Sequence, residues 1–259
     1  MTDQIKADFL RMRKSKLMYV ILIGQFLISL FMIRNQISNN EHYETMEPGD
    51  VVCLSALISY GTLLGYMMGL VSLKLAILEK RDGLLRNKVM TGTSRVSIFL
   101  SKVIVNYIIS AVLFAIHMGT VITVSAIEYK GLLPGFGTLM EYAGICLLWM
   151  IFFSAMMAML ALCLTSDVIS TVLTFLVVSV LPTLPGSLDA RMEMPKYYGT
   201  FIFKVFKFIK SIIPYTYMIP EKDPGSVAEA FRGGIIPALA LAVIFITLGC
   251  LSFRRKEFN

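Results

Sequence analysis

Charged side chains are scarce in this sequence. They make up 16% of the 259 residues, whereas soluble domains carry about 25%, and hydrophobic residues make up 56%. This composition excludes an ordinary soluble domain. Several runs exceed the roughly 18 apolar residues that indicate a transmembrane helix. The sequence therefore predicts an all-α membrane protein that crosses the bilayer several times and has no room for a sizeable soluble domain.

Paired cysteines and clusters of metal ligands are also lacking. All four cysteines lie in apolar runs, no two of them form a Cys-x-x-Cys motif, and no histidine lies near one of them: Cys53, Cys146, Cys163 and Cys250. We therefore expect four small buried side chains rather than a metal or redox site. Residues 1–16 are largely polar and no small-residue cleavage site follows the first apolar run, so a cleavable signal peptide is not expected.

The apolar runs themselves predict six transmembrane helices within a single membrane domain, residues 1–259. Their approximate bounds are 17–33, 51–73, 103–125, 141–164, 168–185 and 235–253. No aspartate or glutamate lies in the interior of these spans, because Glu141 and Asp167 fall at span ends. A secondary transporter would need a midplane carboxylate or an unwound helix to couple an ion, and an intramembrane protease would need a catalytic pair. The sequence favours neither class.

Lysine and arginine are distributed unevenly among the connections. They gather at both termini and between the second and third spans: Lys6, Arg11, Arg13, Lys14, Lys16, Lys74, Lys80, Arg81, Arg86, Lys88, Arg95, Lys102, Arg254, Arg255 and Lys256. The short connections on the other side contain only Arg34 and Lys130. Because cytoplasmic connections are enriched in basic residues, we expect both termini and residues 79–102 to be cytoplasmic. The net charge of +7 is then explained by basic residues that set the orientation in the membrane and lie near anionic lipid headgroups. No nucleic-acid partner is expected.

The outer region between the fifth and sixth spans, residues 187–234, is expected to contain two short helices. One face of residues 197–213 carries four polar side chains: Thr200, Lys204, Lys207 and Ser211. This spacing indicates an amphipathic helix that dips into the outer leaflet or packs on the bundle and ends at Pro214. A seventh span here would place the basic C-terminus outside, against the charge pattern. A second helix is predicted to begin at a capping box of Ser226 and Glu229 and to stop at Gly233.

Residues 1–16 have the pattern of an interfacial helix along the inner leaflet. Ile5, Phe9 and Met12 fall on one helical face, and Lys6 lies mostly off it with Arg13 and Lys14. An unstructured basic tail is the alternative interpretation.

The most charged stretch of the chain, residues 79–95, reads EKRDGLLRNKVMTGTSR and lies between the second and third spans. Asp82 is positioned to cap a helix that begins at Gly83, and Gly92 is positioned to end it in a left-handed conformation. Ser94 would then cap the next helix. A helix of this length is marginal in water by itself, so span ends or a partner must hold it. The alternative is a solvated basic loop.

The side chains of this short helix are expected to divide into two groups. Arg86 and Lys88 would face the cytosol. Four apolar side chains would supply contacts to the rest of the protein: Leu84, Leu85, Val89 and Met90.

This stretch resembles the connection between spans two and three in the permeases of type 2 ATP-binding-cassette exporters. That family has an acidic-basic-acidic-Gly element, a short helix, a Pro- or Thr-Ser-Arg element and then a lysine at the third span. The matching residues here are Glu79, Asp82, Gly83, Ser94, Arg95 and Lys102, with Thr93 where many members have proline. The order of elements over the whole chain is also similar to that family, including small bacterial permeases of peptide export or peptide immunity.

The resemblance implies that residues 79–95 form a coupling helix that docks on a separate ATPase subunit in the cell membrane. The chain itself has no GxxxxGK[ST] phosphate loop. It is therefore not expected to be an enzyme or to bind a cofactor, and ATP and Mg would be held by the partner. Two ATPase copies and a second permease chain, identical or paralogous, complete the expected assembly.

Two further patterns lie within the spans. Gly61, Gly65 and Gly69 form a small-residue ladder beside Met67 and Met68, which favours close helix packing inside the bundle or, by the family resemblance, a pathway or protomer interface. A second pattern is a polar stripe of three residues on one face of the third span: Asn106, Ser110 and His117. Interhelical hydrogen bonding is the favoured explanation, and a functional polar pathway is the alternative. No metal site is expected at His117.

The spans favour an amphipathic or hydrophobic substrate. They carry no interior carboxylate for a cation, and the outer connections are too short for a large external domain. Permeases that resemble this one often serve export of antimicrobial or cytolytic peptides, so such a peptide is expected. A lipid or hydrophobic drug, or a non-transporting immunity or assembly role, is the alternative.

Overall fold

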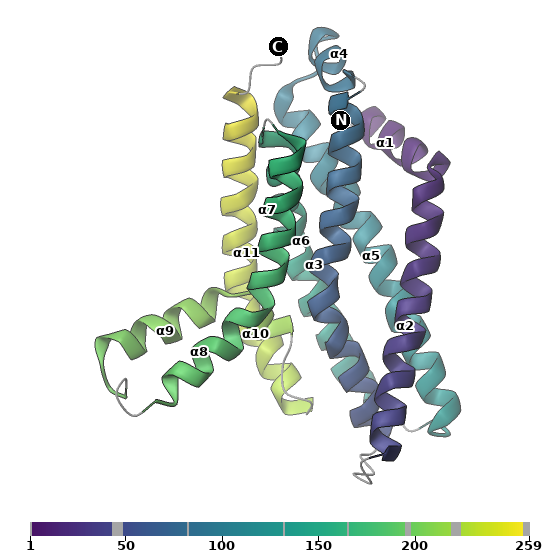
Figure 1. Ribbon diagram of the computed structural model, residues 1–259, viewed down its shortest axis with the longest axis vertical. Helices are drawn as coiled ribbons and strands as arrows, with labels where there is room; N and C mark the ends of the chain where they lie inside the picture. The colour runs from purple at the N-terminus through teal and green to yellow at the C-terminus, as the bar shows by residue number, and fades with distance from the viewer. Residues whose placement is uncertain are drawn as a thin grey trace.

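The computed structural model describes residues 2–42, 49–81, 83–131, 133–164, 166–194, 198–218 and 224–255. Within these residues every regular element is a helix, and the long helices stand side by side as one bundle (Figure 1). The expectation of an all-α membrane protein is confirmed.

Within the described part of the chain, six segments are long and apolar enough to cross a membrane, as predicted. They are α2 (Lys16–His42), α3 (Gly49–Arg81), α5 (Arg95–Glu128), α6 (Phe136–Cys163), α7 (Asp167–Val180) with its continuation, and α11 (Pro224–Arg255). The helix α7 continues through a 3₁₀ turn, η1 (Leu181–Thr183), into α8 (Leu184–Met192). The helices α3 and α5 have 33 and 34 residues. About 20 residues suffice to cross the hydrocarbon, so both helices extend beyond it.

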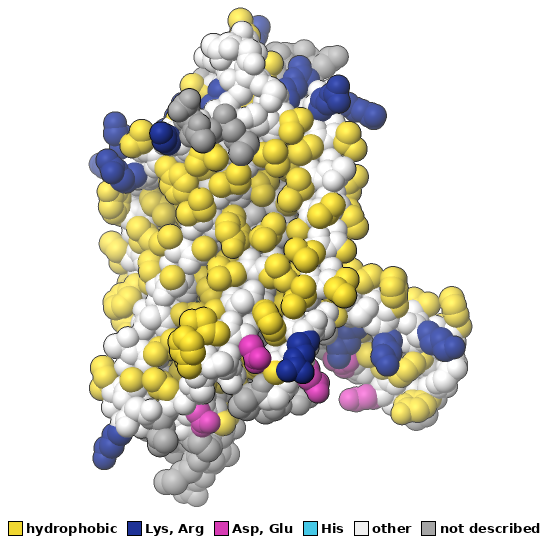
Figure 2. Space-filling model, turned by 180° about the vertical axis from the view of Figure 1, so that it is seen from behind, with side chains coloured by type: hydrophobic (Ala, Val, Ile, Leu, Met, Phe, Trp, Pro, Cys, Tyr) yellow, Lys and Arg dark blue, Asp and Glu magenta, His cyan; other side chains and the backbone are white. Residues whose placement is uncertain are grey.

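The centre of the bundle is α6, which packs against α11, α3 and α5. Its aromatic residues Tyr142, Trp149 and Phe153 are fully buried. The Tyr142 hydroxyl donates a hydrogen bond of 2.9 Å to the carbonyl of Leu57 on α3, which satisfies a polar group inside the core. The outer helices instead present large apolar side chains to their surroundings. Phe31 of α2 is one of them. Hydrophobic side chains cover the middle of the molecule in Figure 2, as a membrane-spanning bundle requires.

Two short helices lie at the end of the bundle where both chain termini are found (Figure 1). They are α1 (Thr2–Lys14) and α4 (Leu84–Met90), and we call this end the α4 side. The helix α1 matches the predicted interfacial helix, so the unstructured tail is excluded for residues 2–14. It meets α2 at Ser15 and packs against α5.

At the opposite end, α8 and α9 (Phe201–Ile212) form a hairpin that projects sideways from the bundle, and α10 (Tyr215–Met218) follows (Figure 1). We call this end the hairpin side. The predicted amphipathic helix is thus confirmed as α9. The hydroxyl of Thr200 accepts a hydrogen bond of 3.3 Å from the amide of Phe203 and caps it. An ion pair of 2.6 Å between Lys210 and Asp189 holds α9 to α8.

The predicted short helix that stops at Gly233 is wrong. Residues 224–255 form one helix that continues through Gly233 and Gly234. Tertiary packing explains this, because a β-carbon on Gly234 would lie 2.5 Å from the side chain of Ile145 and 3.1 Å from that of Tyr217. The glycine lets α11 approach α6 and α10 closely instead of ending a helix.

Candidate functional site

The short helix α4 lies between the ends of α3 and α5. Its C-terminus is closed by a Schellman motif: the amide of Thr93 donates to the carbonyl of Lys88 and that of Gly92 to Val89, both at 3.1 Å. Gly92 has φ of 86°, so the predicted left-handed ending is confirmed. Ser94 accepts a hydrogen bond of 3.2 Å from the amide of Ser97 and caps α5 as predicted.

The start of α4 differs slightly from the prediction. The helix begins at Leu84, and Gly83 precedes it in the left-handed conformation with φ of 65°. Gly83 tolerates this conformation because it has no β-carbon. Asp82 lies outside the described residues, so its capping role stays a prediction.

One face of α4 is buried in the bundle. Leu85 is 2% exposed and belongs to an apolar cluster that includes Ile98 and Phe99 of α5 and Phe253 of α11. Leu84 and Val89 are partly buried. A seven-residue helix cannot persist alone in water, so this packing is what holds α4 in place.

The exposed face of α4 corrects two expectations. Arg86 is exposed as predicted, together with Asn87. Met90, which was expected to contact the rest of the protein, is 74% exposed. Lys88 was expected to face outward, but its side chain is only 15% exposed and points into the bundle because two carboxylates lie there.

These carboxylates belong to a group of five charged side chains that we call the ion cluster: Asp8, Arg11, Glu79, Lys88 and Lys102. One oxygen of Glu79 lies 2.7 Å from Lys102 Nζ, 2.9 Å from Lys88 Nζ and 2.8 Å from Arg11 Nη1. Asp8 lies 2.8 Å from Lys102 Nζ and 3.3 Å from Lys88 Nζ. The cluster therefore joins four elements, α1, α3, α4 and α5.

The ion cluster is almost fully buried at its centre. Asp8 is 1% exposed, and Glu79 and Lys102 are 3% exposed each. Taking such charges out of water is costly unless they are closely paired, and here each has partners of opposite charge. Burial alone would raise the pKa of Asp8, but the ammonium groups of Lys102 and Lys88 outweigh it and hold the pKa below its usual value. The four elements are thereby tied to one arrangement.

Asp8 and Arg11 were not predicted as members of this site. The signal was present in α1, because Asp8 falls on the same helical face as Ile5 and Met12, at spacings of three and four residues. A carboxylate on the apolar face of a short helix predicts a buried cationic partner. Lys102 was noted for the basic charge pattern and the family motif, but not as a buried partner of carboxylates.

Further contacts tie the same end of the bundle together. Arg95 donates a hydrogen bond of 2.8 Å to the carbonyl of Arg254, which joins the start of α5 to the end of α11. Lys80 donates one of 3.0 Å to the carbonyl of Leu164 and lies 3.3 Å from Asp167, which joins α3 to the connection before α7. Hydrogen bonds and an ion pair of side chains therefore hold the helix ends together on the α4 side.

The polar stripe of α5 is buried, with Asn106, Ser110 and His117 each no more than 2% exposed. The Nδ1 atom of His117 lies 3.0 Å from the hydroxyl of Ser29 on α2, at hydrogen-bonding distance. Its ring also stacks on Tyr60 of α3, with ring centroids 4.1 Å apart. The predicted interhelical hydrogen bonding is thus seen at His117. The side chains of Asn106 and Ser110 have no hydrogen-bond partner among the described residues.

The glycine ladder of α3 packs within the chain. All three of its glycines are buried: Gly61, Gly65 and Gly69. A β-carbon on Gly65 would lie 2.6 Å from the Tyr215 hydroxyl of α10, and one on Gly69 would lie 2.8 Å from the Thr174 methyl of α7.

The two methionines beside the ladder lie on different sides of α3. Met68 is buried in the central core, whereas Met67 packs toward α5 and α1. The glycines of α3 therefore allow this helix to pack closely against α7 and α10.

Comparison with known proteins adds one match. A family model described as ABC-2 family transporter protein matches residues 4–180, which include most of α1, the ion cluster, α4 and all of α7. No curated protein matches the chain.

Proposed function

The chain belongs to the ABC-2 family of transporters, and from this premise we propose that α4 is the docking surface for an ATP-hydrolysing partner. Permeases of this family are membrane transport subunits that do not themselves hydrolyse ATP. The chain is accordingly a multi-pass membrane permease of an ATP-binding-cassette exporter. ATP and Mg are held by the partner in this proposal, which has two ATPase copies and a second permease chain, identical or paralogous.

The observation that carries the docking proposal is the division of α4 into a fixed face and a free face. Leu85 and Lys88 bind the helix to the bundle, whereas Arg86, Asn87 and Met90 face outward. An exposed basic and apolar surface on a firmly held helix is suited to transmit force from a docked subunit, because the helix cannot move without moving its neighbours.

The ion cluster supplies the connection from α4 to the spans. Lys88 of α4 shares its carboxylate partners with Lys102 of α5, so a displacement of α4 acts directly on the ends of α3, α5 and α1. In this proposal Lys88, Glu79 and Lys102 are positioning residues that transmit the movement of a docked ATPase, and the α4 side with both termini is cytoplasmic. The gathering of Lys and Arg at that end supports this orientation.

For the substrate we propose an amphipathic antimicrobial or cytolytic peptide. Two features support a substrate of this kind. The polar side chains buried along the middle of α5 are uncharged at Asn106 and Ser110, so this part of the span carries no fixed charge of the kind that a metal cation would require. The face of the spans that Figure 2 shows is largely apolar in the middle of the molecule.

The test of the assignment is purification of the tagged full chain from its native membrane in a mild detergent. We expect an ATPase subunit to copurify in stoichiometric amounts, and its absence would favour a non-transporting immunity or assembly protein. The reconstituted complex then tests the substrate, because a transported amphipathic helical peptide should change the hydrolysis rate at low micromolar concentration. Stimulation by lipids or drugs but not by a panel of peptides would overturn the peptide proposal and favour the alternative.

A further inference from the structure

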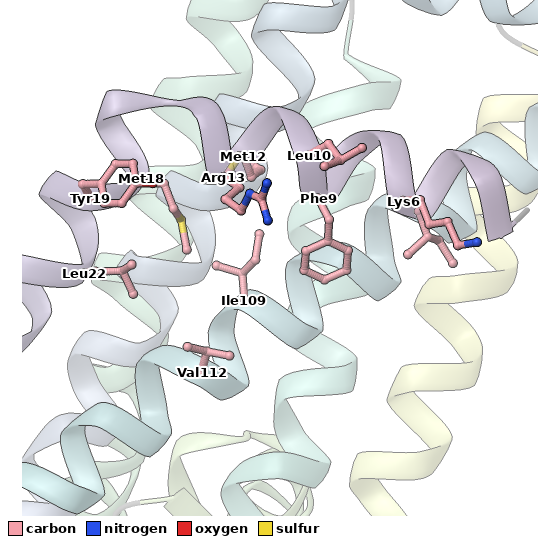
Figure 3. Close-up of a pocket in the computed structure, with 11 residues that line it drawn as sticks. Lys6, Phe9, Leu10, Met12, Arg13, Met18, Tyr19, Leu22, Ile109 and Val112 are labelled. Atoms are coloured by element: carbon pink, nitrogen blue, oxygen red, sulfur yellow. The ribbon is translucent and has the colours of Figure 1, made fainter.

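An apolar groove of about 790 Å³ lies between α1, α2 and α5 on the α4 side. Figure 3 shows α1 crossing above it, with Phe9 directed down toward the groove, Leu22 on α2 at one side, and Ile109 and Val112 on α5 below. The volume falls within the roughly 300–1,000 Å³ of pockets that bind small molecules. Its walls are apolar side chains of three helices.

Two basic residues of α1, Lys6 and Arg13, line the same groove and are exposed. The Arg13 side chain lies over the groove toward Ile109 (Figure 3). Neither basic side chain forms an ion pair with a residue whose side chain the structure describes. Arg11 of the same helix, in contrast, is paired with Glu79 in the ion cluster. The helix α1 therefore directs one cation inward to a carboxylate and leaves two beside an apolar groove.

We propose that this groove binds one anionic phospholipid, with an acyl chain along Leu22, Ile109 and Val112 and the phosphate at Arg13 and Lys6. The groove lies where α1 meets the first turns of α2, so it occupies the level at which headgroups give way to hydrocarbon. A guanidinium group pairs with a phosphate through two parallel hydrogen bonds, and it does so best where water is partly excluded. Charge complementarity thus selects an anionic lipid over a zwitterionic one.

The bound lipid covers apolar side chains and pairs basic side chains that the protein itself leaves exposed around α1. Phe9 and Met12 pack toward α5, but Leu10 is 50% exposed and Tyr19 of α2 is 56% exposed beside the groove. An acyl chain covers this surface, and the phosphate pairs Lys6 and Arg13, for which the described residues supply no carboxylate partner. The lipid in this proposal is a resident ligand and not cargo, so the inference stands independently of the transport assignment.

The test is native mass spectrometry of the full chain in detergent, titrated with dioleoyl phosphatidylglycerol or dioleoyl phosphatidylcholine. We expect phosphatidylglycerol to bind more tightly. The double variant K6Q/R13Q should lower its affinity about 30-fold, since each basic side chain near an anionic surface contributes a factor of about five, and should leave phosphatidylcholine unchanged. The matched control K204Q/K207Q removes two exposed cations from α9 and should change neither affinity.

A second measurement locates the site. Phosphatidylglycerol with a photoreactive diazirine in its acyl chain should form adducts with Leu22, Ile109 or Val112, and V112W, which fills the groove, should abolish them. Equal affinities for the two lipids, an unaltered K6Q/R13Q variant or adducts confined to other helices would overturn the proposal. A disulfide between two copies of a V112C variant would also overturn it, because a second chain would then cover the groove. None of these results would bear on whether an ATPase copurifies.

Discussion

Lys88 Nζ lies 2.9 Å from Glu79 Oε1, so the short helix α4 is fastened to the end of α3 by two side chains nine residues apart. The same carboxylate oxygen lies 2.7 Å from Lys102 Nζ at the start of α5. One acidic side chain thereby organises the connection between two spans. This gives α4 a fixed position before any partner is bound.

The first prediction concerns the centre of this ion cluster. Lys102→Met should lower the free energy of unfolding by about 3–5 kcal/mol, the usual cost of removing one member of a buried ion pair. The loss arises because Asp8 and Glu79 stay buried with fewer cationic partners. Unfolding in a denaturing-detergent titration measures it. Arg86→Gln, on the exposed face of α4, is the control and should stay within about 0.5 kcal/mol of the parent. Equal stability of the two variants would refute a structural role for the cluster.

The second prediction is the pH dependence that Asp8 confers. Its pKa in the folded chain lies below the ordinary value of 3.8, so Asp8 contributes stability at pH values above that ordinary value. This contribution is lost as the pH falls through the folded-state pKa. Asp8→Asn should therefore be less stable than the parent at pH 7, and the difference should shrink on acidification below about pH 4. Midpoints of thermal unfolding between pH 7 and pH 3 test this, and a constant difference would contradict it.

The third prediction addresses the glycine ladder. Gly69→Ala should destabilise the chain by about 1–3 kcal/mol, the range for overpacking a closed interface, because the new methyl group would lie 2.8 Å from the Thr174 side chain. Gly119→Ala adds the same methyl group to α5, where no described atom outside the adjoining turns of the helix lies within 4 Å, and should be neutral or slightly stabilising. If both variants unfold alike, α3 and α7 do not pack as closely as the structure has them.

Local signals in the sequence predicted the features of the fold that local interactions decide. Ser94 and Gly92 act on backbone groups within a few residues, and both were predicted correctly. Hydropathy gave the six spans for the same reason, since the bilayer acts on each helix separately. Thr200 was expected on the polar face inside the amphipathic helix, but it precedes Phe201 and caps that helix instead. The stop expected at Gly233 failed because α11 is held by contacts to distant helices, and packing overrode the local signal.

The candidate site was predictable only in part. Glu79, Lys88 and Lys102 come from one stretch that a family motif singles out, but Asp8 is 80 residues away from Lys88. The spacing of residues within α1 predicts that Asp8 is buried, but it does not predict which cations pair with it. The inward turn of Lys88 likewise depends on which carboxylates tertiary folding places near it, and the sequence of α4 alone contains no such information.

The fourth prediction tests the orientation of the bundle. Single cysteines are introduced into a variant whose four native cysteines are replaced by alanine. Cysteines at Asn39 and Lys207, both exposed on the hairpin side, should react in whole cells with a reagent that does not cross membranes. A cysteine at Arg86 should react only after the membrane is permeabilised. Labelling of the Arg86 position in intact cells would contradict a cytoplasmic α4 side.

The fifth prediction tests α4 as the docking surface. The double variant R86E/M90D changes only its outward face, where Met90 is 74% exposed and Arg86 makes no ion pair with a described residue. Membrane insertion and unfolding should therefore be unchanged, while copurification of the ATPase falls about tenfold or more, because a buried unpaired charge at an interface commonly costs more than 1.4 kcal/mol. The matched control K207E/F208D makes the same kinds of change on the exposed face of α9, where Phe208 is 66% exposed, and should retain the partner. Retention of the ATPase at full stoichiometry by R86E/M90D would show that the partner docks elsewhere, and the ion cluster would then serve the stability of the α4 side alone.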